Sequence, residues 1–158
     1  MSGPQKSPPK LRGTCCEQRV AIQAPAEAVW AVLADFAGWP AWNPVYVETG
    51  GTLAAGEAIT VAVALPGMKR QRARATVTAV EPPRLIEFSL RGFGGLLRIC
   101  RYIDITSTGP ASCRVGNGEI MGGPLGRMLA RTVGGKVRDG LKAMNEALRA
   151  RVEQSASV

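Results

Sequence analysis

The sequence predicts an α+β fold in which a curved antiparallel sheet of about seven strands surrounds one long C-terminal helix. The first observation is an apolar residue at every third or fourth position across residues 124–152, which is the spacing of one helix face. The second is that most of the remaining chain alternates apolar and polar residues in short segments bounded by glycine and proline. A helix of that length rises roughly 44 Å, so it needs a broad apolar partner, which the strands supply.

The first part of the chain predicts one strand and two short helices. The strand is expected over residues 15–23. Residues 24–27 place a proline and an acid in the first turn of a helix that ends near Asp35, and both residue types favour a helix start. A stretch rich in glycine and proline follows, in which Trp39 and Trp42 lie three residues apart and indicate one more helical turn.

Six further strands are expected before the long helix, and short turns between them favour an antiparallel meander. Their predicted ranges are 45–48, 58–65, 69–81, 85–91, 96–106 and 112–121. The strand over 69–81 alternates most clearly. One face carries Arg70, Arg72 and Arg74, which together with Lys69 form a basic stripe that is expected to be solvated. The inner face carries Ala73, Ala75, Val77 and Ala79. These alanines are small, so the helix must sit close to them or a void must remain.

The length of 158 residues fits one domain, predicted over residues 14–153, with disordered tails at 1–13 and 154–158. No apolar run approaches the roughly 18 residues of a membrane span. The N-terminal residues are polar and resemble no signal peptide, so the protein is expected in the cytoplasm, as a monomer or homodimer.

The absence of histidine removes the usual catalytic triads and most transition-metal sites. The four cysteines, at positions 15, 16, 100 and 113, form no CxxC pair, so we expect free thiols, no metal site and no cofactor. The net charge of +8 is expected to reflect a solvated basic surface. No aromatic-rich basic motif of the RNA-binding type is present, so no specific nucleic-acid partner is expected.

Three stretches carry a resemblance to a known family: residues 24–30 (APAEAVW), 35–44 (DFAGWPAWNP) and 77–85 (VTAVEPPRL). With the closing helix, they resemble the START-like, or SRPBCC, superfamily, which includes polyketide cyclases/dehydratases and lipid-transport proteins of the Bet v 1-like helix-grip fold. The resemblance covers about residues 15–152. It implies an apolar cavity between the sheet and the C-terminal helix. It also places the mouth near the Trp39–Asn43 turn, the loops between strands and the start of the long helix.

Two neighbouring strands place polar groups on the face expected inside. On the strand over 96–106, Arg101 shares its face with leucine and isoleucine. On the strand over 112–121, Asn117 and Glu119 share a face and should lie beside Arg101. A buried charge needs a partner, so we expect Arg101 to pair with Glu119, assisted by Asn117. Two interpretations stay open: the cluster orients the polar group of a ligand, or it is a structural salt bridge.

The sequence therefore predicts binding of a hydrophobic or amphipathic small molecule, as in a carrier or sensor. The predicted ligand-binding residues are Trp42, Phe88, Arg101, Asn117, Glu119, Met121 and Met128. One alternative is a polyketide cyclase- or dehydratase-like enzyme using Glu119 and Arg101. The lack of histidine and of a recognisable catalytic set weighs against an enzyme. Because Arg101 would lower the pKa of Glu119, the carboxyl is also expected to be a poor base. The other alternative is a protein or anionic-surface interaction module that uses the basic stripe and the N-terminal tail.

Overall fold

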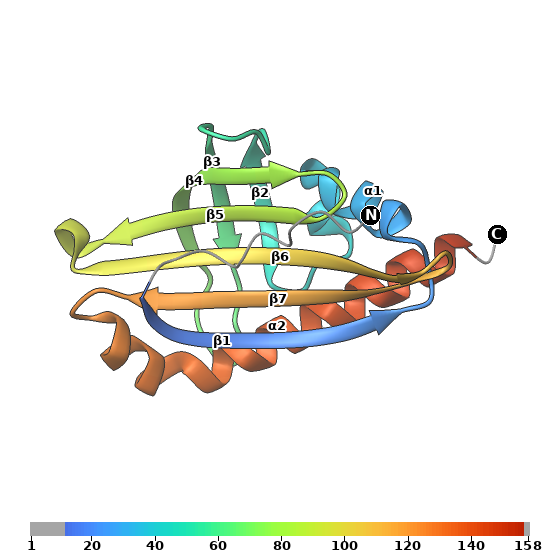
Figure 1. Cartoon of the computed structure of the whole chain (residues 1–158). Helices are drawn as coiled ribbons and strands as arrows, with labels where there is room; N and C mark the ends of the chain where they lie inside the picture. The colour runs from blue at the N-terminus through green and yellow to red at the C-terminus, as the bar shows by residue number, and fades with distance from the viewer. Residues whose placement is uncertain (1–11, 157–158) are drawn as a thin grey trace.

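The computed structural model describes residues 12–156, and within them it contains one sheet and two α-helices (Figure 1). The elements in chain order are β1 (Gly13–Ile22), α1 (Ala26–Ala34), the 3-10 helix η1 (Phe36–Ala41), β2 (Tyr46–Gly51), β3 (Ala58–Val63), β4 (Gln71–Glu81), β5 (Leu85–Gly92), the 3-10 turn η2 (Phe93–Gly95), β6 (Leu97–Gly109), β7 (Ser112–Gly122) and α2 (Gly126–Ala156). The predicted tails lie mostly outside the described residues. Where they are described, Gly13 begins β1, and α2 continues through the first residues of the C-terminal tail.

The seven strands form one antiparallel sheet in the order β1-β7-β6-β5-β4-β3-β2. The predicted α+β architecture, with the sheet curved around a long C-terminal helix, is confirmed. In Figure 1, α2 runs along the sheet beside β1 and β7, while β2 and β3 run across the direction of β5, β6 and β7, and the end of β4 runs alongside β5. No helix among residues 12–156 is long and apolar enough to span a bilayer.

The main core lies between the sheet and the C-terminal half of α2. Met144, Leu148 and Val152 pack there with Trp39 and Phe88. The preceding turns of α2 belong to a smaller buried cluster with β1 and β7, made of Cys16, Met121, Val137 and Leu141. Leu129 and Val133, nearer the start of α2, are only half-buried against that cluster. The core-facing side of α2 is therefore buried from Val137 onward and only half-buried at Leu129 and Val133.

The prediction of which β4 side chains face the core is wrong in the second half of the strand. Val77 pairs with Phe88, but Ala79 pairs with Glu87, so β4 carries one extra residue at Thr78. Such a bulge reverses the faces of the residues that follow it. Val80, rather than Ala79, therefore packs against the core.

The turn between α1 and β2 is built by its own side chains. Trp39 is fully buried, and its Nε1 donates to the Leu33 carbonyl at 2.9 Å. The Asn43 Oδ1 accepts the backbone N–H groups of Val45 and Tyr46 at 2.9 and 3.0 Å. These bonds fix the start of β2 and hence the position of the Tyr46 ring, which reaches the polar cluster described below.

Candidate functional site

A cavity of about 230 Å³ lies between the inner face of the sheet and the first half of α2. Its lining is mainly apolar, with side chains from each strand of β2 to β7 and from α2, including Tyr46, Val61, Phe88, Leu129 and Leu141. The charged side chains of the lining are Arg72, Arg101 and Glu119. This combination of an apolar wall with few polar groups is typical of small-molecule sites.

Arg101 is the centre of the polar groups in the cavity. It is 3% exposed. Its Nε donates to the Tyr46 hydroxyl at 2.7 Å, and its Nη1 donates to the Asn117 Oδ1 at 2.6 Å and to the Gly118 carbonyl at 2.8 Å. Within residues 12–156, the hydrogen-bond partner of its Nη2 is the Met144 sulfur, at 3.8 Å, and thioether sulfur is a weak acceptor. Nη2 therefore keeps the capacity to donate to an oxygen atom of a ligand.

The expected ion pair between Arg101 and Glu119 is wrong. The two residues are opposite one another in the β6–β7 register, as expected. However, the hydrogen bonds of Arg101 go to Tyr46, Asn117 and Gly118, and the two charged groups are not among the ion pairs of the described residues. Neutral acceptors already take up most of the hydrogen-bond donors of the Arg101 guanidinium. Its hydrogen bonding therefore does not depend on the Glu119 carboxylate.

Glu119 is half-buried in the cavity wall. Burial raises the pKa of its carboxyl above the ordinary value of 4.5, and the nearby charge of Arg101 only partly opposes this effect. Arg101 does lower this pKa, as expected, but the effect of burial is larger, so the expected net lowering is wrong. A carboxyl of this kind keeps its proton to a higher pH, so it can donate a hydrogen bond to a ligand as well as accept one.

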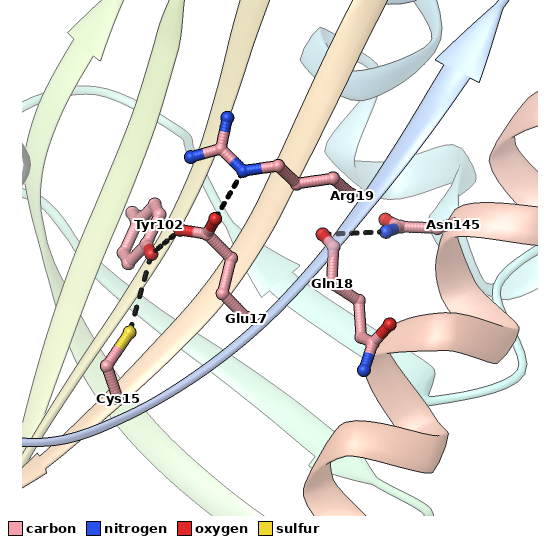
Figure 2. Close-up of polar contacts among 6 residues, drawn as sticks. All are labelled: Cys15, Glu17, Gln18, Arg19, Tyr102 and Asn145. Carbon is pink, nitrogen blue, oxygen red and sulfur yellow. Dashed lines mark hydrogen bonds and ion pairs between the residues drawn. The ribbon is translucent and has the colours of Figure 1, made fainter.

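A second polar chain supports Arg101 from the helix side. The Asn117 Nδ2 donates to the Asn145 Oδ1 at 3.2 Å, and the Asn145 Nδ2 donates to the Gln18 carbonyl at 3.0 Å. Figure 2 shows this last bond, which ties α2 to β1. Asn145 and Tyr46 were missed by the sequence analysis. The available signal was that Asn145 falls four residues after Leu141, on the apolar stripe of α2.

The seven residues predicted to bind ligand divide into three groups. Phe88, Arg101 and Glu119 line the cavity. Asn117 is buried behind Arg101, and Met121 is buried in the smaller cluster under α2. Neither Trp42, half-buried against the main core, nor Met128, 61% exposed, is part of the cavity lining.

The expected position of the cavity mouth is only partly met. The β3–β4 loop and the first half of α2 contribute Leu65, Met68 and Leu129 to the lining. No residue of the Trp39–Asn43 turn belongs to the lining, because Trp39 is committed to the core. Three aromatic contacts hold that turn, from Trp39 to Phe36, Trp42 and Tyr46.

The predicted basic stripe lies beside the cavity, along β4 and the residues just before it, and its Arg72 also contributes to the cavity lining. Arg70 and Arg72 both pair with Glu48, at 2.9 and 3.2 Å. A second, more open hollow of about 470 Å³ follows this stripe, between Glu48, Thr60, Arg72 and Arg74. It is the larger of the two volumes. We still regard the smaller cavity as the candidate site, because a more enclosed, apolar space with buried polar groups suits a small ligand better.

The outer face of β1, β7 and β6 carries a separate polar cluster, drawn in Figure 2. The Tyr102 hydroxyl donates to the Glu17 carboxylate and lies 3.6 Å from the Cys15 sulfur. Arg19 pairs with the same carboxylate. Burial, followed by the bond to Glu17, raises the pKa of the Tyr102 phenol. Among residues 12–156, no group of three or more histidine, cysteine or acidic residues could hold a metal ion, and the four cysteines form no disulfide.

Comparison with known proteins agrees with this architecture. The family model described as "Polyketide cyclase / dehydrase and lipid transport" matches residues 14–153. The chain belongs to this family. No curated protein matches the chain significantly.

Three solved structures illustrate the similarity of this chain to proteins with the same fold. The Zhui aromatase/cyclase from Streptomyces sp. R1128 superimposes with a TM-score of 0.75 at 15% identity, covering 90% of this chain and 95% of that one. A START superfamily protein from Mycobacterium smegmatis gives 0.67 at 20% identity, with coverages of 90% and 99%. A norcoclaurine synthase point mutant from Thalictrum flavum gives 0.69 at 18%, with coverages of 94% and 99%. At these identities, the likeness concerns the fold.

Proposed function

We propose that this protein binds a hydrophobic or amphipathic small molecule in the cavity beneath α2, as a carrier or sensor. The observation that carries the proposal is the cavity itself, an apolar space with Arg101 and Glu119 in its wall. The family includes lipid-transport proteins and cyclases, which supports a ligand of this class. We also propose a cytoplasmic location, because the four cysteines remain unpaired and a reducing compartment keeps thiols in that state.

The polar groups of the cavity indicate what the ligand must offer. Arg101 retains donor capacity at Nη2, and Glu119 has a raised pKa. A ligand with an acceptor oxygen, such as a carbonyl, phenolate or carboxylate, would satisfy Nη2. The remainder of the ligand must be apolar to match Val61, Phe88 and Leu129.

Native mass spectrometry of the purified protein, followed by solvent extraction, tests the proposal. We expect an apolar compound with at least one acceptor oxygen to leave the protein on extraction. Ala73→Leu fills part of the cavity, because Ala73 belongs to its lining. Ala58→Leu is the matched control, since Ala58 is exposed on the adjacent strand. Retention of the compound by Ala73→Leu, or its equal loss in both variants, would contradict binding at this site.

A second candidate function is catalysis of the cyclase or dehydratase type, favoured by the raised pKa of Glu119. A carboxylic acid that holds its proton to a higher pH than an ordinary carboxyl can act as a general acid. The compound recovered by extraction, or a product of it, would then be a substrate for assay. Glu119→Gln keeps the shape and hydrogen-bonding capacity of the side chain. Under the enzyme hypothesis it abolishes turnover while binding remains. Under the carrier proposal no turnover is found in either protein.

A further inference from the structure

Among residues 12–156, three large apolar side chains are exposed, and all three lie at one end of the molecule. Phe93 is 74% exposed and Leu96 is 49% exposed, in and just after the turn between β5 and β6. Met128 is 61% exposed in the first turn of α2. The Leu125 amide donates to the Leu96 carbonyl at 3.1 Å, so the two segments are in direct contact. Figure 1 shows the β5–β6 turn and the start of α2 at the same end.

The backbone of this turn holds the Phe93 ring outward against its local preference. Phe93 has a φ of 52° and is the non-glycine residue with positive φ in the described chain. This conformation is a genuine outlier for a bulky side chain. Gly94 and Gly95 follow with φ of 66° and 96°. A strained residue with an exposed ring has no explanation in core packing, and backbone strain of this kind gathers at functional positions.

The charged residues in the two segments that carry these apolar side chains are all arginines. Arg91, Arg98, Arg127 and Arg131 are exposed, and none of them is in the ion pairs of the described residues. The sequence contains no acidic residue from position 88 to 103 or from 120 to 138. We call residues 91–98 and 124–131 together the arginine tip. Its composition matches surfaces that insert apolar side chains between lipid headgroups while arginines attract anionic lipids.

The cavity extends toward the arginine tip. Leu90 and Ile99, paired on β5 and β6 close to the turn, are part of its lining. Leu129, next to Met128, contributes from α2. A ligand leaving the first half of α2 would therefore reach this end of the molecule.

We propose that the arginine tip docks on the surface of an anionic lipid bilayer. A second copy of the chain is a poorer occupant, because four unpaired arginines would face four identical ones and like charges repel. An anionic surface instead supplies the missing counter-charge and an apolar layer for Phe93, Leu96 and Met128. Docking does not require an occupied cavity, so its test is independent of ligand binding.

Flotation of the full chain with lipid vesicles tests the proposal. Vesicles of phosphatidylcholine alone are compared with vesicles that also contain phosphatidylglycerol, at low and at high salt. We expect binding only to the anionic vesicles, and weaker binding at high salt because salt screens the attraction. Arg127→Gln and Arg131→Gln should each lower the binding constant about five-fold. Arg149→Gln with Arg151→Gln is the control, since it removes two exposed charges from the other end of α2.

Phe93→Gly separates apolar insertion from charge. Glycine accepts a positive φ without strain, so this variant is expected to fold at least as well as the parent protein. Loss of the inserted ring should lower vesicle binding about ten-fold. Three outcomes would overturn the proposal. They are no binding to anionic vesicles, binding that Phe93→Gly leaves unchanged, and equal losses in the tip variants and the Arg149/Arg151 control. A concentration-dependent dimer that Phe93→Gly dissociates would also overturn it, in favour of a second copy.

Discussion

Arg101 and Tyr102 are consecutive residues of β6, yet they face opposite sides of the sheet and have different surroundings. Both are nearly fully buried, at 3% and 2% exposed, and both are hydrogen-bonded through polar side-chain atoms. Arg101 borders a cavity, whereas the Tyr102 ring lies against the backbone of β7. The difference teaches that packing distinguishes the candidate site from a structural cluster. Polarity alone does not.

Two glycines of β7 allow close packing on the outer face of the sheet. A Cβ atom at Gly118 would lie 2.2 Å from the Tyr102 ring, and one at Gly116 would lie 2.2 Å from the Asp104 carboxylate. These two glycines let the side chains of β6 lie across β7 and reach β1. Asn117, between them, faces inward and holds Arg101. The stretch 116–118 therefore serves both faces, and this explains its glycines without a phosphate-binding role.

Substitution of Arg101 by methionine should have the largest effect on stability. The change leaves the Tyr46 hydroxyl, the Asn117 Oδ1 and the Gly118 carbonyl without their donor. Each buried acceptor that loses its partner costs about 1–3 kcal/mol, and the relief of burying a charge offsets part of that sum, so we expect a net loss of about 3 kcal/mol. Urea unfolding measures it. An unchanged midpoint would show that the cluster contributes little to the fold.

Gly118→Ala tests the packing of the outer face. The new methyl group must displace the Tyr102 ring, which breaks the bond from Tyr102 to Glu17. Forcing an extra methyl into a packed site costs typically about 1–3 kcal/mol, and we expect about 2 kcal/mol. Gly135→Ala is the contrasting control, because a Cβ there meets nothing within 4 Å. In the helix it should stabilise the protein by up to about 1 kcal/mol. Equal effects of the two substitutions would remove the packing argument for the outer face.

Tyr102→Phe sharpens the comparison further by removing one oxygen and keeping the ring. The lost bond to Glu17 should lower the free energy of unfolding by about 1 kcal/mol. Binding of a cavity ligand or of a fluorescent apolar probe should stay unchanged, since Tyr102 is not part of the cavity lining. Titration with the probe checks this. A parallel loss of probe binding would mean that the two faces of β6 are coupled.

The fold was predictable because its signals are periodic. Every strand in the described chain and the long helix follow from alternation or from steps of three and four residues, with bounds that differ by a few residues. Ala79 was misplaced because a bulge is a local change of register that the alternation of β4 does not announce. The inward positions of Arg101, Asn117 and Glu119 followed from the same alternation.

The contacts of the candidate site were not predictable to the same degree. Arg101 donates a hydrogen bond to Tyr46, which lies 55 residues earlier in the chain. The position of Tyr46 is in turn fixed by the turn at Asn43. Such a long-range contact leaves no periodic trace in the sequence. Met128 was assigned to the cavity because it lies on the apolar stripe of α2, but no part of the sheet covers its side chain, which is 61% exposed in the first turn of that helix. A stripe predicts a face, and the end of the partner surface decides which of its members are covered.

Glu119 and Asp104 give the smallest and most specific test of the comparison, because each face carries a carboxyl whose pKa is raised by burial. A carboxyl with a raised pKa in the folded protein favours its protonated form there. The stability that the protonated carboxyl adds to the folded protein is therefore fully present below its ordinary pKa, which is 4.5 for Glu119 and 3.8 for Asp104. This stability is lost as the pH rises through the raised pKa of the folded protein. Glu119→Gln and Asp104→Asn do not titrate, so each variant should gain stability relative to the parent protein as the pH rises across that range.

Thermal unfolding of the three proteins between acid and neutral pH measures these differences, and probe binding over the same range separates the two faces. Glu119→Gln should remove a pH dependence of probe binding, because the cavity wall then keeps one charge state. Asp104→Asn should leave that dependence intact, since Asp104 lies on the outer face beside Gly116. If both variants changed probe binding alike, the cavity would respond to the overall charge of the sheet. A stability difference that is flat with pH would instead mean that Glu119 titrates normally and that burial does not hold its proton.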